Sequence, residues 1–297
     1  MAIALLTSAF ITSHYKKIAI SSTMTRTYSA AWHGFKQRLR EKDGLKNNFL
    51  LANQFLQQQK GLPELQGTTD IYSYGQTYLL TNQYKWSPRP IFQSYSVFTA
   101  KLADLNQKHL LSDKSPENIL FRIEPIDRRL PSLEDGASWP VLFNNYRPSA
   151  LLNDFLVLKR KSFNTPPTRH YREEKHALGE TVFLPKMSDS IFVKIAIEPT
   201  FWGKLAILFY KPSQLRVIIL LKNGEQRQFR FSANMAKSGF LLSPLIENTE
   251  EFAWYYEKNY RLANKEVVAF RLETVNKNWE WHHEFGYQAL TLSHLLL

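Results

Sequence analysis

The spacing of apolar residues along this 297-residue chain changes twice. Up to about residue 60, apolar residues recur every three or four positions, as in Phe49, Ala52, Phe55 and Leu56. This is the stripe of an amphipathic helix. Short apolar runs then alternate with helical stripes as far as residue 165, and short runs at even spacing fill the remainder. The pattern predicts a helical arm over 1–60, an α/β domain over 61–165 and a β-rich domain over 166–297.

Two helices are expected in the arm, over 28–40 and 45–59, with a break at Asp43-Gly44. The chain begins with an apolar run, MAIALLTSAFI, which is shorter than the ~20 residues that span a bilayer. Lys16 and Lys17 follow this run, whereas a signal peptide has its basic residues before the apolar core. Three interpretations remain open: an interfacial anchor, the end of a membrane segment encoded elsewhere, and an ordinary amphipathic helix.

The middle segment alternates strands with helices, which is the order of parallel α/β units. Thr99 is the expected N-cap of the second helix. The predicted strands are 70–74, 89–95, 118–123 and 155–158, and the predicted helices are 76–83 and 99–111. A small Rossmann-like segment is therefore expected here.

Short apolar runs separated by turn residues follow the polar stretch 162–175, whose Pro166-Pro167 pair suggests a domain boundary. Asn223-Gly224 is a strong signal for a two-residue hairpin. One helix is expected over 249–256, capped by Asn248 or Thr249. Strands are predicted over 181–184, 191–197, 204–210, 216–221, 226–231, 266–272 and 287–295. This spacing favours a jelly-roll-like β-sandwich, so the fold class is multidomain α+β.

Charge is concentrated in the arm. The chain has a formal net charge of +12, and residues 1–60 hold nine basic against two acidic residues, a net of +7. A basic arm can bind nucleic acid or anionic lipid. We favour a basic segment beside a membrane or a solvated helix face, and expect no nucleic-acid partner. There is no cysteine, which excludes disulfides, thiolate zinc sites and a cysteine nucleophile.

Unusual polar residues follow the predicted strands of the α/β segment, and ligands of such sheets bind at the carboxyl ends of strands. Asp127 and Asp135 are the candidates for acid/base chemistry. Gln93, Tyr95, Glu124 and Arg129 are the candidate binding residues. The other residues at these ends are Tyr74, Gln76, Ser94, Ser96, Arg128 and Glu134. The alternative for this set is an exposed loop with internal ion pairs, which contribute little stability.

No GxGxxG, GxxxxGK[ST], HExxH or GxSxG motif is present, which argues against the common nucleotide, zinc-peptidase and serine-hydrolase classes. No cofactor and no metal site are expected. We interpret His170 and His176, and likewise His282-His283, as exposed loop residues rather than metal ligands. Six aromatic residues of the β-rich segment suit either carbohydrate binding or core packing. They are Trp202, Trp254, Tyr255, Tyr256, Trp279 and Trp281.

Four strings carry a resemblance to a known group of proteins. They are DIYSYGQ (70–76), PRPIFQSYSVFTAKLADLN (88–106), ILFRIEPIDRRLPSLEDGASWPVLFNNY (119–146) and GFLLSPLIEN (239–248). They resemble the C-terminal region of uncharacterised bacterial polytopic membrane proteins, over roughly residues 45–297. Where Gly75 and Arg128 stand, that group has an acidic residue and a glycine. In it, an α/β segment and a β-sandwich follow a membrane region similar to that of lipid-linked-sugar glycosyltransferases.

The resemblance implies a soluble region outside the cytoplasm at the bacterial cell envelope. The leading hypothesis is a non-catalytic extracytoplasmic module of, or derived from, a membrane protein that handles envelope sugars or polymers. Its expected partners are a polytopic membrane protein, envelope glycan and, through the arm, the membrane surface. One alternative is an enzyme acting on envelope glycans with Asp127 and Asp135 as its carboxylate pair. The other is a nucleic-acid-binding protein that uses its basic arm.

Overall fold

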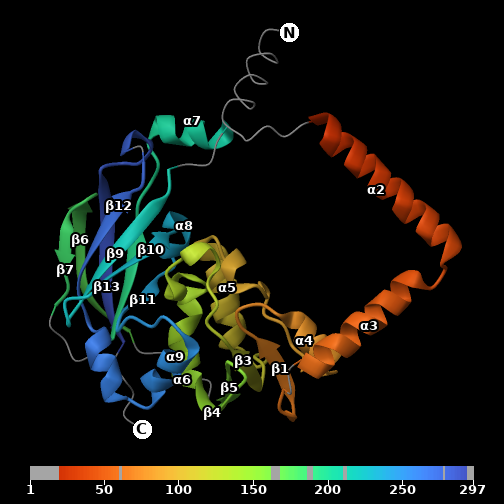
Figure 1. Ribbon diagram of the computed structural model, residues 1–297. Coiled ribbons are helices and arrows are strands. Elements are labelled where there is room, and N and C mark those ends of the chain that lie inside the picture. The colour runs from red at the N-terminus through yellow and green to blue at the C-terminus, as the bar shows by residue number, and fades with distance from the viewer. Residues whose placement is uncertain are drawn as a thin grey trace. The chain divides into compact units, whose positions relative to one another are not determined.

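The computed structural model describes residues 20–59, 62–161, 168–185, 190–209, 213–276 and 278–292 (Figure 1). The contacts divide the chain into two compact units, residues 1–59 and 60–297. Each unit is described by itself. The mixed α+β class expected from the sequence is confirmed.

The first unit contains two helices, α2 (Ile20–Arg40) and α3 (Gly44–Gln59). One stripe of α2 is apolar and exposed, at Met24, Tyr28, Trp32, Phe35 and Leu39. The predicted apolar run at residues 1–11 lies outside the described residues. Among the helices that the structure describes, none is both long and apolar enough to cross a membrane.

A mixed five-stranded sheet begins the second unit, in the order β2-β1-β3-β5-β4. Strands β2, β1 and β3 are parallel, whereas β5 pairs antiparallel with both β3 and β4. The strands are β1 (Thr68–Ile71), β2 (Lys85–Trp86), β3 (Asn118–Phe121), β4 (Tyr146–Leu152) and β5 (Phe155–Arg160). The helices between them are α4 (Gln76–Thr81), α5 (Ala100–Leu110) and α6 (Trp139–Asn145).

The predicted strand over 89–95 is wrong. The second strand lies earlier, at β2, and the chain then runs irregularly into a 3-10 turn at Ser94–Ser96. Pro88 and Pro90 have no N–H to donate to a sheet ladder. Arg89 between them turns inward and is almost fully buried.

Two antiparallel four-stranded sheets form the rest of the unit, in the orders β10-β9-β12-β7 and β11-β8-β13-β6. Strand β9 alternates between buried and partly exposed positions, whereas β11 is buried throughout, and buried residues of the two sheets meet in one core. The first sheet has β7 (Thr181–Phe183), β9 (Leu215–Leu221), β10 (Gln226–Phe231) and β12 (Val267–Thr274). The second has β6 (Thr168–Ala177), β8 (Ser190–Ala196), β11 (Phe240–Ser243) and β13 (Glu284–Leu292).

Several local predictions are confirmed. Thr99 caps α5 by accepting a hydrogen bond from the Leu102 N–H at 3.3 Å. Asn248 caps α9 (Thr249–Tyr256) by accepting from the Glu251 N–H at 2.9 Å. A hairpin at Asn223-Gly224 does join β9 to β10, but its loop has three residues, 222–224, and not two: the Gly224 N–H and the Glu225 carbonyl both bond to Leu221, and Gly224 has a positive φ.

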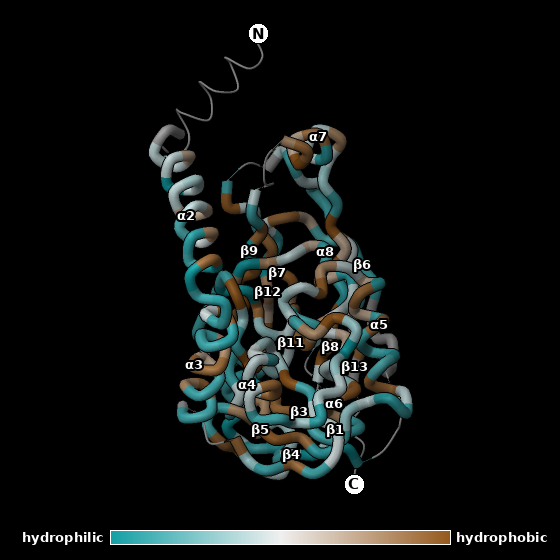
Figure 2. The backbone as a smooth tube through the Cα atoms, turned by 90° about the vertical axis from the view of Figure 1, so that its right-hand side faces the viewer, coloured by the Kyte–Doolittle hydropathy of each residue, from teal (hydrophilic) through white to brown (hydrophobic). Residues whose placement is uncertain are grey.

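Two predictions for the β-rich segment are wrong. The run 204–210 is not a strand: residues 201–209 form helix α7 (Phe201–Phe209). A short apolar run has no periodicity that separates helix from strand, and here Thr200 caps a helix by accepting from the Gly203 N–H. The loop expected for His170 and His176 is the second wrong prediction, because both lie in β6, which includes part of the polar stretch 162–175 and pairs with β13. Both views place α7 at the end of this unit opposite β4 (Figures 1 and 2).

The five-stranded sheet and the antiparallel sheets share buried contacts. One core cluster contains Tyr72 and Phe121 from the α/β part of the chain. The same cluster contains Phe192, Leu241 and Phe252 from the β-rich part. Phe121 and Phe252 stack with their ring centroids 4.0 Å apart. The boundary expected near residue 165 therefore falls inside a single compact unit.

We predict that Gly136→Ala destabilises the second unit by about 1–3 kcal/mol, because overpacking of a tight contact costs this much. A Cβ at Gly136 would overlap the carbonyl oxygen of Gly239 and crowd Phe240. Gly286→Ala is the matched control, because its Cβ would meet Ala196 at an ordinary 3.8 Å. Chemical denaturation measures both. Equal stability of the two variants would contradict the close packing at Gly136.

Candidate functional site

The order of the parallel strands defines where a ligand would bind. Strand β1 lies between β2 and β3, so the chain leaves β1 towards one side of the sheet and later returns on the other side. Open α/β sheets bind ligands outside the carboxyl ends of their strands at such a reversal of strand order. We therefore expect a ligand to bind at the residues that follow β1 and β3.

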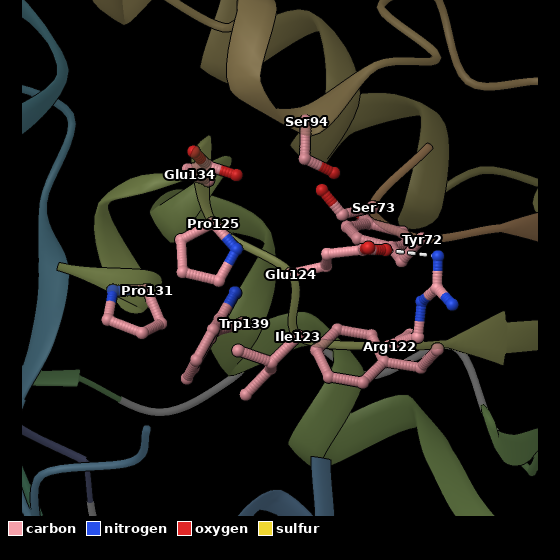
Figure 3. Close-up of a pocket in the computed structure, with 11 residues that line it drawn as sticks. Tyr72, Ser73, Ser94, Arg122, Ile123, Glu124, Pro125, Pro131, Glu134 and Trp139 are labelled. Carbon is pink, nitrogen blue, oxygen red and sulfur yellow. Dashed lines mark ion pairs between the residues drawn. The ribbon is translucent and has the colours of Figure 1, made fainter. Parts of the chain in front are cut away.

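A small pocket lies at this position, and we call it the switch-point pocket (Figure 3). Tyr72 and Ser73 follow β1, and Arg122, Ile123 and Glu124 follow β3. Ser94 and Glu134 come from the intervening loops, and the rings of Phe121 and Trp139 line the pocket with Pro125 and Pro131. The cavity volume is about 20 Å³. This is room for about one water molecule.

Two serine hydroxyls in the pocket make no hydrogen bond of normal geometry, and of these two Ser73 lies beside the Glu134 carboxyl group. The Oγ atoms of Ser73 and Ser94 are buried, and neither makes a hydrogen bond of normal geometry with the part of the chain that is described. Figure 3 shows these hydroxyls turned towards each other. Buried polar groups are nearly always paired, and an unpaired group costs about 1–3 kcal/mol. Such a pair at a pocket indicates a place for an external hydrogen-bonding group.

Glu134 supplies the pocket with a buried carboxyl group. Its side chain is 4% exposed, and burial raises its pKa to about 7. The backbone N–H of Ile126, which donates to its Oε1 at 3.0 Å, opposes this rise, as do Arg129 at 3.7 Å and the nearby Ser73 hydroxyl. Near neutral pH, Glu134 can therefore be a donor or an acceptor.

Glu124 lies at the more open side of the pocket, with 41% of its side chain exposed and an ion pair to Arg122. The pKa of Tyr74 is raised, mainly by burial and next by the neighbouring Glu124. The Tyr74 ring meets the Tyr95 ring edge to face, with the centroids 5.9 Å apart. The half-buried Tyr74 ring thus lies beside this carboxylate, and the half-buried Tyr95 ring packs against Tyr74.

A network of buried polar side chains next to the pocket holds the end of β1 in place. Arg89 Nε lies 3.3 Å from Asp70 Oδ2, and both side chains are fully buried. The Arg89 guanidinium also donates to the carbonyls of Ile71 and Phe92, and lies 3.2 Å from the centroid of the Tyr72 ring. These contacts fix the end of β1, and so the position of Ser73.

Asp135 belongs to this network and not to the pocket lining. Its carboxylate accepts hydrogen bonds from the Tyr72 hydroxyl at 2.8 Å, the Asn106 amide at 3.0 Å and the Ser138 hydroxyl at 2.9 Å. Burial raises its pKa to about 6, against the influence of Arg89 and these donors. Because both oxygens are engaged in the interior, we do not assign Asp135 the acid/base role considered above.

Asp127 and Arg129 lie at a second, larger cleft. Asp127 is exposed and pairs with Arg230 at 2.6 Å, while Arg129 is buried and lies 3.9 Å from Asp127. The cleft has a volume of about 350 Å³. Its lining includes Arg129, Arg230, Phe98 and Trp281. Asp127 and Asp135 therefore do not meet in one cavity, and the carboxylates that share one are Glu124 and Glu134.

The other predicted binding residues contribute mainly through the backbone. Gln93 is half-buried, and its carbonyl accepts from the Ser96 N–H. The Tyr95 carbonyl accepts from Arg129 at 3.1 Å. Sequence reasoning placed Ser94 and Glu134 at strand ends but did not single them out, and it missed Ser73. The available signal was the position of Ser73 directly after a buried strand.

The aromatic candidates named from the sequence differ in how deeply they are buried. Tyr255 is buried, and Trp254, Tyr256 and Trp281 are partly buried, whereas Trp202 and Trp279 are 65% and 52% exposed. His176 lies in β6 and hydrogen-bonds Glu174 and Glu180. In the described ranges, no group of three or more His, Cys, Asp or Glu residues could hold a metal ion.

No protein-family model matches the sequence, and no curated protein matches it. Among solved structures, the chain has a distant likeness to AlgX from Pseudomonas aeruginosa, with 11% sequence identity and a TM-score of 0.28. The match covers 76% of this chain and 48% of AlgX, so it spans about half the length of that protein. A likeness at this level carries no argument about function.

We predict that Glu134→Gln gains stability over the wild type as pH rises from 5 to 8. The native pKa of about 7 lies above the ordinary value of 4.5, so the native state binds more protons than the unfolded chain between these pH values. The contribution of Glu134 is present below the unfolded pKa and is lost as pH rises through 7. The stability difference between variant and wild type should grow by roughly 2 kcal/mol.

Urea denaturation at pH 5 and pH 8 measures this difference. Comparison of the two proteins at each pH cancels the titration of all other groups. A difference that is the same at both pH values would show that Glu134 is not held in a desolvated site.

Proposed function

We propose that this protein is a non-catalytic extracytoplasmic module, of or derived from a membrane protein that handles envelope sugars or polymers. Its switch-point pocket binds a hydroxyl group of the glycan. The observation that carries the proposal is the buried Ser94 hydroxyl, which has no hydrogen-bond partner among the described residues, next to the Ser73 hydroxyl and two carboxyl groups. A sugar hydroxyl both donates and accepts, so it complements serine hydroxyls and carboxylates together.

The size of the pocket supports a hydroxyl or hydroxymethyl group rather than a whole sugar ring. A volume of about 20 Å³ admits one water-sized group, so the remainder of the ligand would lie over the mouth. Tyr74 lies beside Glu124, which lines the pocket, and Tyr95 packs against Tyr74. Aromatic faces there would cover the apolar side of a sugar ring.

The proposal includes architecture and location. The shared core of the two antiparallel sheets supports a β-sandwich of the jelly-roll-like kind, and the parallel strands β2-β1-β3 support a Rossmann-like segment. We place the protein at the bacterial cell envelope with its second unit outside the cytoplasm, beside a polytopic membrane partner. The exposed apolar stripe of α2, with Arg26, Lys36, Arg38 and Arg40 on the same helix, supports contact between the arm and a membrane surface.

A second candidate function is an enzyme acting on envelope glycans. The raised pKa of Glu134 favours it, because a carboxyl group that titrates near neutral pH suits a general acid or base. Glu124 and Glu134 are then the carboxylate pair, in place of Asp127 and Asp135. Release of a cleaved product by the wild type, abolished in Glu134→Gln, would favour the enzyme over the binding module.

We predict that Ser94→Ala weakens glycan binding without loss of stability. Removal of a buried hydroxyl that has no partner should leave the free energy of unfolding unchanged or raise it by up to about 1 kcal/mol. Loss of its hydrogen bond to the ligand should weaken binding about tenfold or more. Suitable probes are neutral hexose disaccharides and N-acetylglucosamine oligosaccharides, with binding measured by saturation-transfer NMR and calorimetry.

Ser138→Ala is the matched control, because it removes an equally buried hydroxyl that does have a partner, Asp135. It should lower stability by about 1–3 kcal/mol and leave the affinity of the folded protein unchanged. Failure of the wild type to bind any of these probes would count against the proposal. So would equal affinity of Ser94→Ala and the wild type.

A further inference from the structure

Helix α7 carries an unusual exposed surface. It has nine residues, FWGKLAILF, and six large apolar side chains on it are exposed. Ile207, which is 41% exposed, lies towards the side of Gly203 and lines the larger cleft, and the other five lie together. Phe201, Leu208 and Phe209 are 73%, 76% and 73% exposed, and Trp202 and Leu205 are 65% and 41% exposed. Surfaces of soluble monomers rarely gather so many apolar side chains on one short element, and such patches mark interaction sites.

These five exposed residues form one stripe. Phe201, Leu205 and Leu208 are separated by four and three residues, and Trp202, Leu205 and Phe209 by three and four, so all five project from one side of the helix. The opposite side contains Gly203, which is buried and whose Cβ position would overlap the carbonyl of Glu280. The helix is therefore held by its small-residue side, and its apolar stripe faces away from the fold.

The attachment of α7 is specific. The Thr200 N–H donates to the Glu280 carbonyl at 3.0 Å, and the Thr200 hydroxyl donates to the Trp279 carbonyl at 2.8 Å. Exposed Trp279 thereby stands next to the start of the helix. Figure 2 shows α7 largely in the brown of hydrophobic residues at the end of the unit opposite β4. This position leaves the stripe accessible to a flat surface.

We propose that α7 inserts into the interfacial region of a lipid membrane and anchors the second unit there. The helix spans about 14 Å, too short to cross a bilayer, so it would lie in the interface. Its aromatic residues, Phe201, Trp202 and Phe209, are typical of the zone between headgroups and acyl chains.

Charge favours lipid over a protein partner. Residues 199–215 include Lys204 and Lys211 and no acidic residue. The next basic residue, Arg216, is paired with Glu273. Lys204 lies on the helix itself and is exposed. Lysines beside an apolar stripe bind the anionic headgroups of a membrane.

The five residues of the stripe line neither of the two pockets, although Ile207 on another side of α7 lines the larger cleft, and the proposal does not depend on glycan binding. It also differs from the arm, because α7 belongs to the second unit. A test must therefore report on α7 locally, since the arm of the full chain can bind vesicles by itself.

The absence of cysteine makes such a local test direct. In the full chain, Leu208→Cys is labelled with an environment-sensitive fluorophore, and Phe183→Cys is the matched control. Phe183 lies on β7 and is 67% exposed, so both labels begin in water. The probes are phosphatidylcholine vesicles, alone or with on the order of one third phosphatidylglycerol.

We expect the label at position 208, and not that at 183, to shift to the blue with vesicles and to be quenched by lipid-borne quenchers. The response should be stronger with phosphatidylglycerol, and the added Phe201→Ser change should weaken it roughly tenfold. Equal responses at 208 and 183, or no response at 208 while the chain sediments with vesicles, would overturn the proposal. So would self-association that buries the label at 208 without lipid.

Discussion

The buried ion pair between Asp70 and Arg89 organises the α/β part of this protein. Asp70 accepts from the Trp86 indole N–H at 3.1 Å, which connects β1 to β2. The Arg89 guanidinium donates hydrogen bonds to the carbonyls of Ile71 and Phe92. It also lies over the Tyr72 ring. A buried pair adds little net stability over an apolar pair, but loss of one partner costs about 3–5 kcal/mol. The pair therefore specifies one arrangement of the strand ends.

Buried polar groups next to this ion pair are satisfied to different degrees. The Asp135 carboxylate accepts hydrogen bonds from Tyr72, Asn106 and Ser138, whereas Arg89 Nη1 has no hydrogen-bond partner among the described residues. The neighbouring pocket contains the Ser94 hydroxyl, which likewise has none, and the Glu134 carboxyl group, whose pKa is raised to about 7. In the proposed function, a hydroxyl group of the ligand would be the partner of Ser94.

The switch-point pocket and the exposed stripe of α7, which we propose as binding surfaces, differ in polarity. At the switch point, polar groups are placed where water is nearly excluded, which strengthens each hydrogen bond to a ligand. At α7, apolar side chains are placed where water is not excluded at all, which favours transfer into another apolar phase. Both surfaces are held by rigid elements, β1 and β3 in one case and the Gly203 contact in the other.

The sequence by itself determined those features that depend on neighbouring residues. The caps at Thr99 and Asn248 and the Asn223-Gly224 hairpin were predictable because each is a bond or a backbone angle within a few positions. Tertiary structure alone decided that Asp135 is buried, that Ser73 and Ser94 meet, and that 89–95 is not a strand. Those outcomes depend on contacts such as Tyr72–Asp135, which join residues 63 positions apart. The run at α7 illustrates the same limit, because only its packing on Glu280 shows which of its sides is left exposed.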